Sequence, residues 1–296
     1  MDIKYFSLPI QDIFLKDDIY GETISLRNYF KYSKLNFIPD FDNPDLIIDC
    51  INFNFWFKHN YNKKPVILKP LFNIFQNIFD FNYITKLVFT CNKEKEVFFQ
   101  KYQVDIPYEI IPIFFDPMEF EMDFYNIPKE KPSIFMTGRL RSENKNILKT
   151  LEILKQQKDY EVWVKGDIYI PGFRNFTNKP ILEYLENRFE TLNLIYNSDI
   201  IIIPSKTESF GRLVVEGLKF NKKIIATPGV NAIWEFPELF DKEIFVIKED
   251  LSDLLDVLKK IDLNKKYPVN IDRYFDLSLV EEMDNLIIEE VIKKNV

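Results

Sequence analysis

The chain has 296 residues, of which 46% are hydrophobic and 29% charged, a composition typical of a soluble globular protein with room for two domains. The formal net charge of −7 argues against a nucleic-acid partner, because proteins that bind phosphate backbones usually carry a basic balance. One histidine and two cysteines are too few for a zinc site or a secreted disulfide framework. No signal peptide and no membrane-spanning run is recognisable, so we expect a cytoplasmic protein.

Short apolar runs rich in β-branched residues predict strands buried on both faces, as in a parallel sheet. These runs lie at 46–48, 65–68, 86–89, 109–113, 133–136, 161–164, 199–203, 223–226 and 243–246. Helices are predicted between them, at about 22–33, 92–102, 145–157, 211–220, 250–261 and 277–293. Alternation of strand and helix predicts an α/β protein with doubly wound, Rossmann-like parallel sheets.

Residues 117–132 interrupt this alternation with three prolines and a charged cluster, which is typical of a connection between domains. We therefore expect an N-terminal domain at 1–117 and a C-terminal domain at 130–275. A helix at 276–296 is expected to pack back onto the first domain. Two such domains face each other across a cleft, and ligands bind at the carboxyl ends of their strands.

Glycine and motif content place the chemistry in the second half of the chain. Of seven glycines only Gly21 precedes residue 138, and glycine is used where backbone turns sharply or approaches a ligand. The sequence lacks G-x-G-x-x-G and G-x-x-x-x-G-K-[ST], which excludes the usual dinucleotide and P-loop sites. A lone D-x-D at 40–42 lies among turn formers and is interpreted as a solvated loop.

The most informative segment runs from Glu208 to Glu216, after a predicted strand that ends at Pro204. Gly211 opens the predicted helix, whose free N–H groups can hold phosphate oxygens. If the segment is fully helical, the two glutamates lie about 12 Å apart along its axis, close to the span of a nucleotide sugar. The alternative is an exposed helix with two unrelated glutamates.

This segment, ESFGRLVVEG, resembles the E-x7-E signature of family 4, the retaining glycosyltransferases of GT-B fold. Other segments resemble family motifs in the same order. They are Gly138-Arg139-Leu140 followed by Lys145, and the stretches 111–116, 162–167, 196–205 and 224–229. The resemblance is good over 133–236 and thin before residue 85.

The resemblance implies a GT-B fold, an acceptor-side first domain and a second domain that binds a nucleoside-diphosphate sugar. It assigns the catalytic roles to Glu208, which contacts the donor sugar, and to Arg139 and Lys145, which neutralise the diphosphate. Glu216 takes the ribose hydroxyls. The implied substrate-binding positions are Glu216, Phe210, Gly211, Ser209, Gly138 and Gly21. No metal or other cofactor is required, because the two cations and the helix amides can carry the diphosphate charge.

The N-terminal half departs from the family pattern. The usual paired glycines are reduced to Tyr20-Gly21, ahead of a predicted helix, and the usual histidine is missing from 65–70. His59 is interpreted as a surface or packing residue. A retaining front-face mechanism needs no protein nucleophile, so retention remains the expectation.

The predicted function is transfer of a sugar to a hydroxyl of a glycan, lipid-linked or protein acceptor. Aromatic residues and lysines mixed over 53–64 could suit a lipid-linked acceptor and peripheral contact with the inner membrane surface. Because phenylalanine is frequent throughout the chain, a core strand with a solvated loop is the preferred interpretation. The alternatives are a sugar-nucleotide epimerase and a non-catalytic nucleotide-sugar or glycan-binding protein. A DNA-modifying transferase is disfavoured by the acidic charge.

Overall fold

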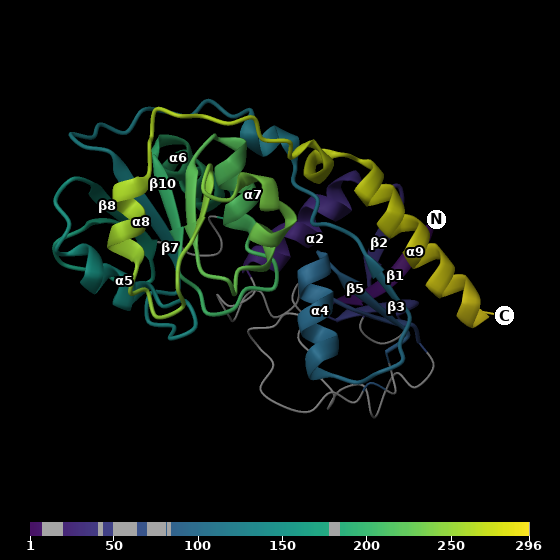
Figure 1. Cartoon of the computed structure of the whole chain (residues 1–296). Helices are drawn as coiled ribbons and strands as arrows, with labels where there is room; N and C mark the ends of the chain where they lie inside the picture. Colours follow the sequence, from purple (N-terminus) through teal and green to yellow (C-terminus); the bar gives the residue numbers. More distant parts are fainter. Residues whose placement is uncertain are drawn as a thin grey trace. The chain divides into compact units, whose positions relative to one another are not determined.

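The computed structural model of the protein describes residues 1–7, 20–40, 44–49, 64–69, 81, 84–177 and 184–295. The chain forms two compact units (Figure 1). The first unit combines Met1–Asp116 with Asp272–Val296, and the second is Pro117–Ile271. Helices in the described ranges are either too short or too polar to cross a membrane.

The first unit contains a six-stranded sheet in which all the pairings are parallel. Its strands are β1 (Asp2–Ser7), β2 (Asn36–Pro39), β3 (Leu46–Asp49), β4 (Val66–Leu68), β5 (Lys86–Phe89) and β6 (Tyr108–Ile110). Their order is β2-β1-β3-β4-β5-β6. The sequence did not predict β1 and β2, because their apolar residues are interrupted by polar residues or proline; tertiary packing buries Ile3 and Tyr5 of β1.

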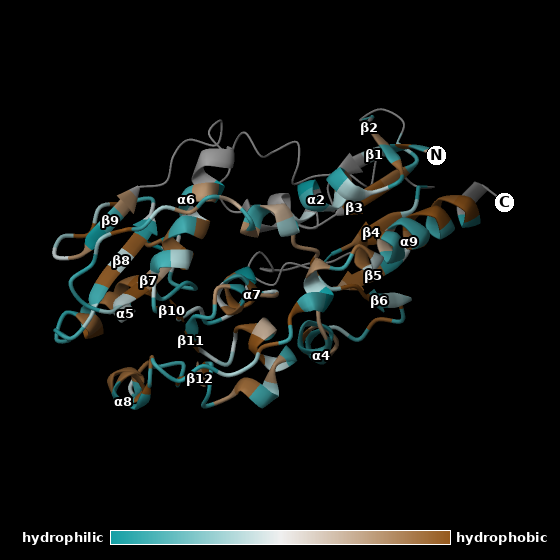
Figure 2. Ribbon diagram, turned by 90° about the horizontal axis from the view of Figure 1, so that it is seen from above, coloured by the Kyte–Doolittle hydropathy of each residue, from teal (hydrophilic) through white to brown (hydrophobic). Residues whose placement is uncertain are grey.

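Helices cover both faces of this first sheet. Helices α2 (Tyr20–Tyr32) and α9 (Ser278–Asn295) share one core cluster with β1, β3 and β4, whereas α4 (Asn92–Lys101) packs its Phe98 against β5. Figure 2 shows β4 and β5 mainly in brown and α9 in both colours, as expected for buried strands and an amphipathic helix. Asp284 fastens α9 to α2: its carboxylate accepts hydrogen bonds from Tyr29 Oη at 2.5 Å and Ser33 Oγ at 2.6 Å.

The second unit also contains a six-stranded parallel sheet. Its strands are β7 (Ser133–Gly138), β8 (Glu161–Gly166), β9 (Arg174–Thr177), β10 (Ile200–Ile203), β11 (Lys223–Ala226) and β12 (Ile244–Val246). The order β12-β11-β10-β7-β8-β9 is that of a doubly wound sheet, in which the winding direction reverses between β7 and β10. The prediction of α/β architecture with doubly wound parallel sheets is therefore confirmed.

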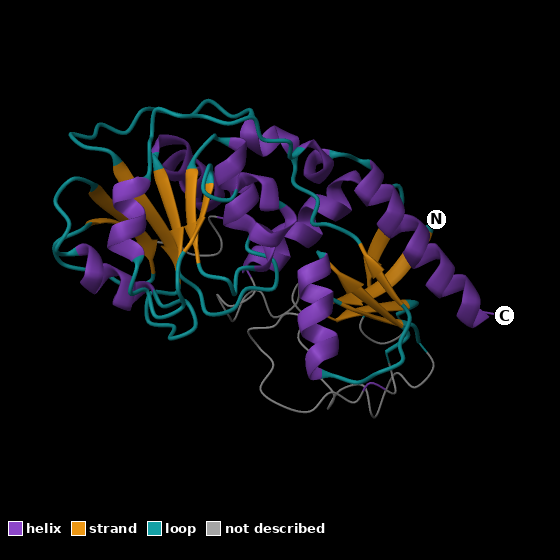
Figure 3. Cartoon of the chain, viewed as in Figure 1, coloured by secondary structure: helices purple, strands orange, loops and turns teal. Residues whose placement is uncertain are grey.

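Helices lie on both faces of this second sheet (Figure 3). Helices α5 (Ile147–Leu154) and α8 (Leu254–Lys260) share a cluster with Ile202 and Ile225. On the other face, Gly217 of α7 (Arg212–Lys219) lies against Ile201 and Ile224, and α6 (Tyr184–Asn197) neighbours α7. The sequence did not predict α6 or the edge strand β9, whose residues are largely polar.

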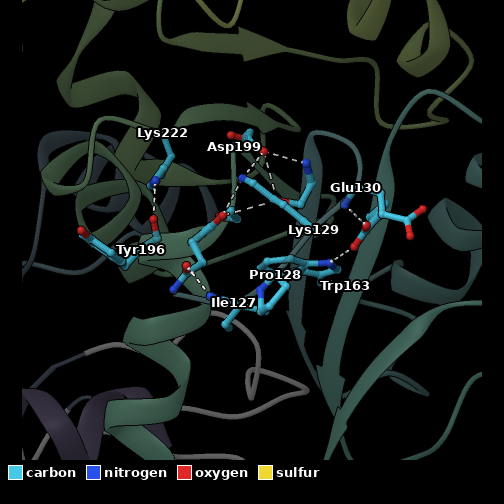
Figure 4. Close-up of polar contacts among 12 residues, drawn as sticks. Ile127, Pro128, Lys129, Glu130, Trp163, Tyr196, Asp199 and Lys222 are labelled. Atoms are coloured by element: carbon cyan, nitrogen blue, oxygen red, sulfur yellow. Dashed lines mark hydrogen bonds and ion pairs between the residues drawn. The ribbon is translucent and has the colours of Figure 1, made fainter. Parts of the chain in front are cut away.

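The segment 117–132 follows α6 to the amino edge of the second sheet. Its short helix η4 (Pro117–Phe120) comes first, and the chain then meets successive α6 residues: the amide of Tyr125 donates to Asn193, and that of Ile127 to Asn197. Lys129 Nζ lies 2.6 Å from Asp199 Oδ2 (Figure 4). The segment is thus ordered and packs against α6 within the second unit.

Candidate functional site

The candidate site lies where β7 and β10 end, at the point where the winding of the second sheet reverses. In doubly wound sheets this reversal leaves a crevice at the carboxyl edge, where ligands bind. The loop after β7 spans 139–146, and the loop after β10 spans 204–211. These two loops carry most of the site residues that the sequence predicted in this half of the chain.

The loop after β7 turns at Gly138, whose φ of +141° is a conformation that side-chain-bearing residues rarely adopt. Leu140 then packs over the end of β8, where Gly166 leaves room for it: a Cβ on Gly166 would lie 2.4 Å from Leu140 Cγ. The amide of Leu140 donates to Asp167 Oδ1 at 3.0 Å. Arg139, between these fixed neighbours, is half-buried. The contacts of Gly138 and Leu140 thus fix the backbone on both sides of Arg139.

Reciprocal hydrogen bonds join this loop to the loop after β10. The amide of Lys206 donates to Asn144 O at 2.7 Å, and Asn144 Nδ2 donates to Thr207 O at 2.9 Å. Thr207 Oγ1 in turn donates to Asn144 Oδ1 at 2.8 Å. Residues 63 apart in sequence are held side by side, so the two loops form one surface.

Glu208 is the point at which the two predicted motifs meet. Its Oε1 accepts a hydrogen bond from Lys145 Nζ at 2.5 Å and another from Ser205 Oγ at 2.6 Å. The side chains of Lys145 and Glu208 are 26% and 14% exposed, so both reach the surface only in part. A partly desolvated cation beside a fixed carboxylate can bind a phosphate and a sugar hydroxyl together.

The E-x7-E segment is not fully helical, which corrects the assumed spacing of its glutamates. Glu208 lies in an extended stretch, where its amide donates to Gly229 O at 2.8 Å, and α7 begins only at Arg212. Gly211, the N-cap residue of α7, is left-handed with φ +98° and ψ 64°, and a Cβ there would lie 2.6 Å from Val230 Cγ1, so the position requires glycine. The distance between the two glutamates therefore cannot be calculated as eight residues at the helical rise.

The residues between Glu208 and α7 are anchored from η6 (Asn231–Glu235). Asn231 Nδ2 donates to Ser209 O at 3.0 Å, and the amide of Ala232 donates to Phe210 O at 2.7 Å. Phe210 is 3% exposed, so its side chain belongs to the core and only its backbone can face a ligand. These contacts fix the entry to α7.

Glu216 is buried, with 3% of its side chain exposed, and two arginines that the sequence analysis did not single out surround it. Arg188 Nη1 lies 2.9 Å and Arg212 Nε 3.4 Å from Glu216 Oε1. The spacing of Arg212 and Glu216, four residues apart on one helix, could have indicated their pairing. Nothing local predicted Arg188, because it comes from α6.

The first unit offers less of the predicted site. Gly21 is the second residue of helix α2, not part of a glycine loop ahead of a helix, so that expectation is corrected. Of the D-x-D motif only Asp40 is described. His59 and the aromatic residues Phe53, Phe55, Trp56 and Phe57 lie outside the described residues. No cluster of three potential metal ligands was found in the described parts of either unit.

Comparison of structures identifies the fold. A glycosyltransferase from Rickettsia africae ESF-5 matches with a TM-score of 0.60 and 17% identity, over 99% of this chain and 96% of that one. Sucrose-phosphate synthase from Thermosynechococcus elongatus matches with a TM-score of 0.61 and 13% identity, over 93% and 79% of the two chains. A mutant TarM from S. aureus in complex with Fondaparinux, alpha-GlcNAc-glycerol and UDP matches at 0.51 and 13%, over 84% and 55%.

Together with the two parallel six-stranded sheets, these matches define the GT-B fold of glycosyltransferases. The identities are low, so the similarity concerns the fold. No protein-family model and no curated protein sequence matches the chain.

Proposed function

We propose that the protein is a retaining glycosyltransferase that moves a sugar from a nucleoside diphosphate to a hydroxyl of a glycan, lipid-linked or protein acceptor. The observation that carries this proposal is the pairing of Lys145 with Glu208, which joins two separate motifs that the family resemblance assigns to donor binding. The pair lies at the winding reversal of a doubly wound sheet, where such folds bind their ligands.

Each side chain has a separate role in this proposal. Arg139 and Lys145 bind the diphosphate and stabilise the charge that develops on the leaving nucleotide. Glu208 accepts hydrogen bonds from hydroxyls of the donor sugar, and Glu216 accepts them from the ribose. The first amides of α7, after Gly211, contribute partial positive charge to the phosphates.

In the proposed reaction the bond between the anomeric carbon and the phosphate oxygen breaks as the acceptor oxygen bonds to the same carbon. The acceptor's proton passes to the leaving phosphate oxygen, so atoms and charge balance. Attack from the face that the diphosphate leaves retains the anomeric configuration. The protein supplies cations and orientation in this scheme and needs neither a covalent nucleophile nor a metal.

A binding panel tests the donor site first. Melting of the protein is measured with UDP, GDP, ADP and TDP and their common sugar conjugates, with and without magnesium. A ligand at 100 times its dissociation constant stabilises the folded state by about 2.7 kcal/mol, which a melting curve resolves. UDP is the first nucleotide to try, because the structurally similar TarM was determined with UDP. No shift with any nucleotide would contradict a donor site.

Release of free nucleotide then tests the reaction. The proposal expects release to depend on an added hydroxyl acceptor and a product that keeps the donor's anomeric configuration by NMR. Conversion of one sugar nucleotide into another without acceptor would indicate an epimerase instead. Tight donor binding without turnover across a wide acceptor set would indicate a non-catalytic binding protein.

A further inference from the structure

A buried cluster of four charged residues includes the second glutamate of the E-x7-E segment. It consists of Glu119 on η4, Arg188 on α6, and Arg212 and Glu216 on α7. Their side chains are 15%, 5%, 11% and 3% exposed. Two carboxylates and two guanidinium groups give the cluster no net formal charge, which suits a site with little access to water.

Arg188 is the centre of this cluster. Its Nε and Nη2 donate to Glu119 Oε2 at 3.0 and 2.8 Å, and its Nη1 lies 2.9 Å from Glu216 Oε1. All three guanidinium nitrogens are therefore engaged. A planar guanidinium held at one end by Glu119 presents its other end in a fixed direction, which a flexible lysine ammonium does not do.

The two oxygens of Glu216 have different surroundings. Oε1 is buried and faces both arginines, in ionic contacts that lack hydrogen-bond geometry. Both arginines make their closest contact to Glu216 at Oε1, not at Oε2. Oε1 is thus the oxygen of Glu216 that the two arginines hold in place.

We propose that Arg188 is a positioning residue, which anchors Glu216 Oε1 so that Oε2 is presented to a ribose hydroxyl of the nucleotide. This inference rests on the proposed function, in which Glu216 binds the ribose. Glu119 supports the arrangement by fixing the far side of the Arg188 guanidinium. Discrimination between ribose and 2′-deoxyribose nucleotides depends, on this account, on a residue that does not touch the nucleotide.

Calorimetric titration with a matched pair of nucleotides tests the proposal. The probe is whichever of UDP, GDP and ADP binds most tightly, and its 2′-deoxy counterpart. Because a hydrogen bond to a charged group contributes to the binding free energy, the wild-type protein should bind the ribonucleotide about tenfold or more tightly than its 2′-deoxy counterpart. Glu216→Gln, Arg188→Lys and Glu119→Gln are each expected to reduce that preference several-fold. A merely structural effect would weaken both nucleotides equally and leave the ratio unchanged.

Glu243→Gln is the matched control. Glu243 is 2% exposed and pairs with Lys223 at 3.1 Å, in a comparably buried ion pair at the opposite, amino edge of the sheet. This variant is expected to lower the melting temperature but to keep the ribose preference. If Arg188→Lys does not fold, Glu119→Gln, which retains Arg188, decides the question.

The outcomes separate the two proposals. If Glu216→Gln loses the ribose preference while Arg188→Lys and Glu119→Gln keep it, the positioning role is overturned and the proposed function stands. If Glu216→Gln keeps the wild-type preference, or the wild type has none, Glu216 does not read the ribose, and both this inference and that part of the site assignment fail. If no nucleotide binds, the proposed function itself is wrong.

Discussion

Lys145 and Glu208, which lie 63 residues apart in the chain, form an ion pair of 2.5 Å between the loops that follow β7 and β10. Ser205 also donates to the same carboxylate oxygen, so the position of Glu208 is fixed from two sides. The lysine is therefore held at the surface by a carboxylate that the proposal places beside the donor sugar. Removal of Lys145 and removal of Glu208 should therefore affect different steps of the proposed reaction.

Lys145→Met is expected to weaken binding of the nucleoside diphosphate by about tenfold, because it removes a charge-assisted contact to phosphate. Glu208→Gln is expected to lower kcat more than it raises KM for the donor, since it alters contacts that orient the reacting sugar. Calorimetry and steady-state kinetics provide the measurements. Lys155→Met is the control, because Lys155 lies at the surface and pairs with exposed Glu152 on the adjoining helix α5. Wild-type donor kinetics in both site variants would show that the site is misassigned.

Gly211→Ala is expected to destabilise the second unit by about 2–4 kcal/mol, because it combines strain at positive φ with overlap. The new Cβ would lie 2.6 Å from Val230 Cγ1, at a φ of +98°. Gly172→Ala is the matched control: its φ is +85°, but nothing lies within 4 Å of its added Cβ. Strain alone should cost about 1 kcal/mol there. Urea denaturation measures both, and equal losses would disprove the overlap argument.

The carboxylate of Asp199 should make stability depend on pH in the acid range. Burial raises its pKa, but hydrogen bonds from Lys129 and from the amide of Ser133 outweigh burial and leave the pKa below the ordinary value of 3.8. Its stabilising contribution is therefore fully present above that value and is lost as the pH falls below it.

Asp199→Asn is accordingly expected to cost about 1–3 kcal/mol at neutral pH and progressively less below about pH 4. Denaturation series at several pH values provide the test. Asp256→Asn is the control, because Asp256 is 71% exposed and pairs with Lys259 on the surface. A difference between wild type and Asp199→Asn that stays constant down to about pH 3 would refute the assignment.

Asp284→Ala is expected to destabilise the first unit by about 2–4 kcal/mol, since it leaves a buried hydroxyl without its acceptor. Its carboxylate accepts from Tyr29, Ser33 and the amide of Lys34. Burial and this carboxylate together raise the pKa of Tyr29 well above its ordinary value. Glu281→Ala, three residues earlier on α9, removes only an exposed pair with Lys34 and should cost less than about 1 kcal/mol. Similar losses in both variants, measured by urea denaturation, would contradict the role of Asp284.

The sequence alone was enough to determine the fold class. Strands such as β10, with four consecutive isoleucines, are apolar throughout, and this pattern follows directly from burial on both faces of a parallel sheet. The sequence also indicated Lys145, Glu208 and Gly211 as site residues, because a motif is defined by residue types and their order, which are local properties. Elements whose own residues are polar or alternating were missed, as with β1, β9 and α6, since their burial comes from partners elsewhere in the chain.

Only the tertiary structure decided which loops meet and how each charge is compensated. The sequence suggested that Gly21 lies in a loop, but Gly21 lies within α2. A single glycine does not show where a helix begins. The eight-residue spacing of Glu208 and Glu216 suggested one helix, yet Gly211 adopts a left-handed conformation and α7 begins only after it. Arg188 lies next to Glu216 because α6 packs beside α7, a non-local contact that leaves no periodic signal in the sequence.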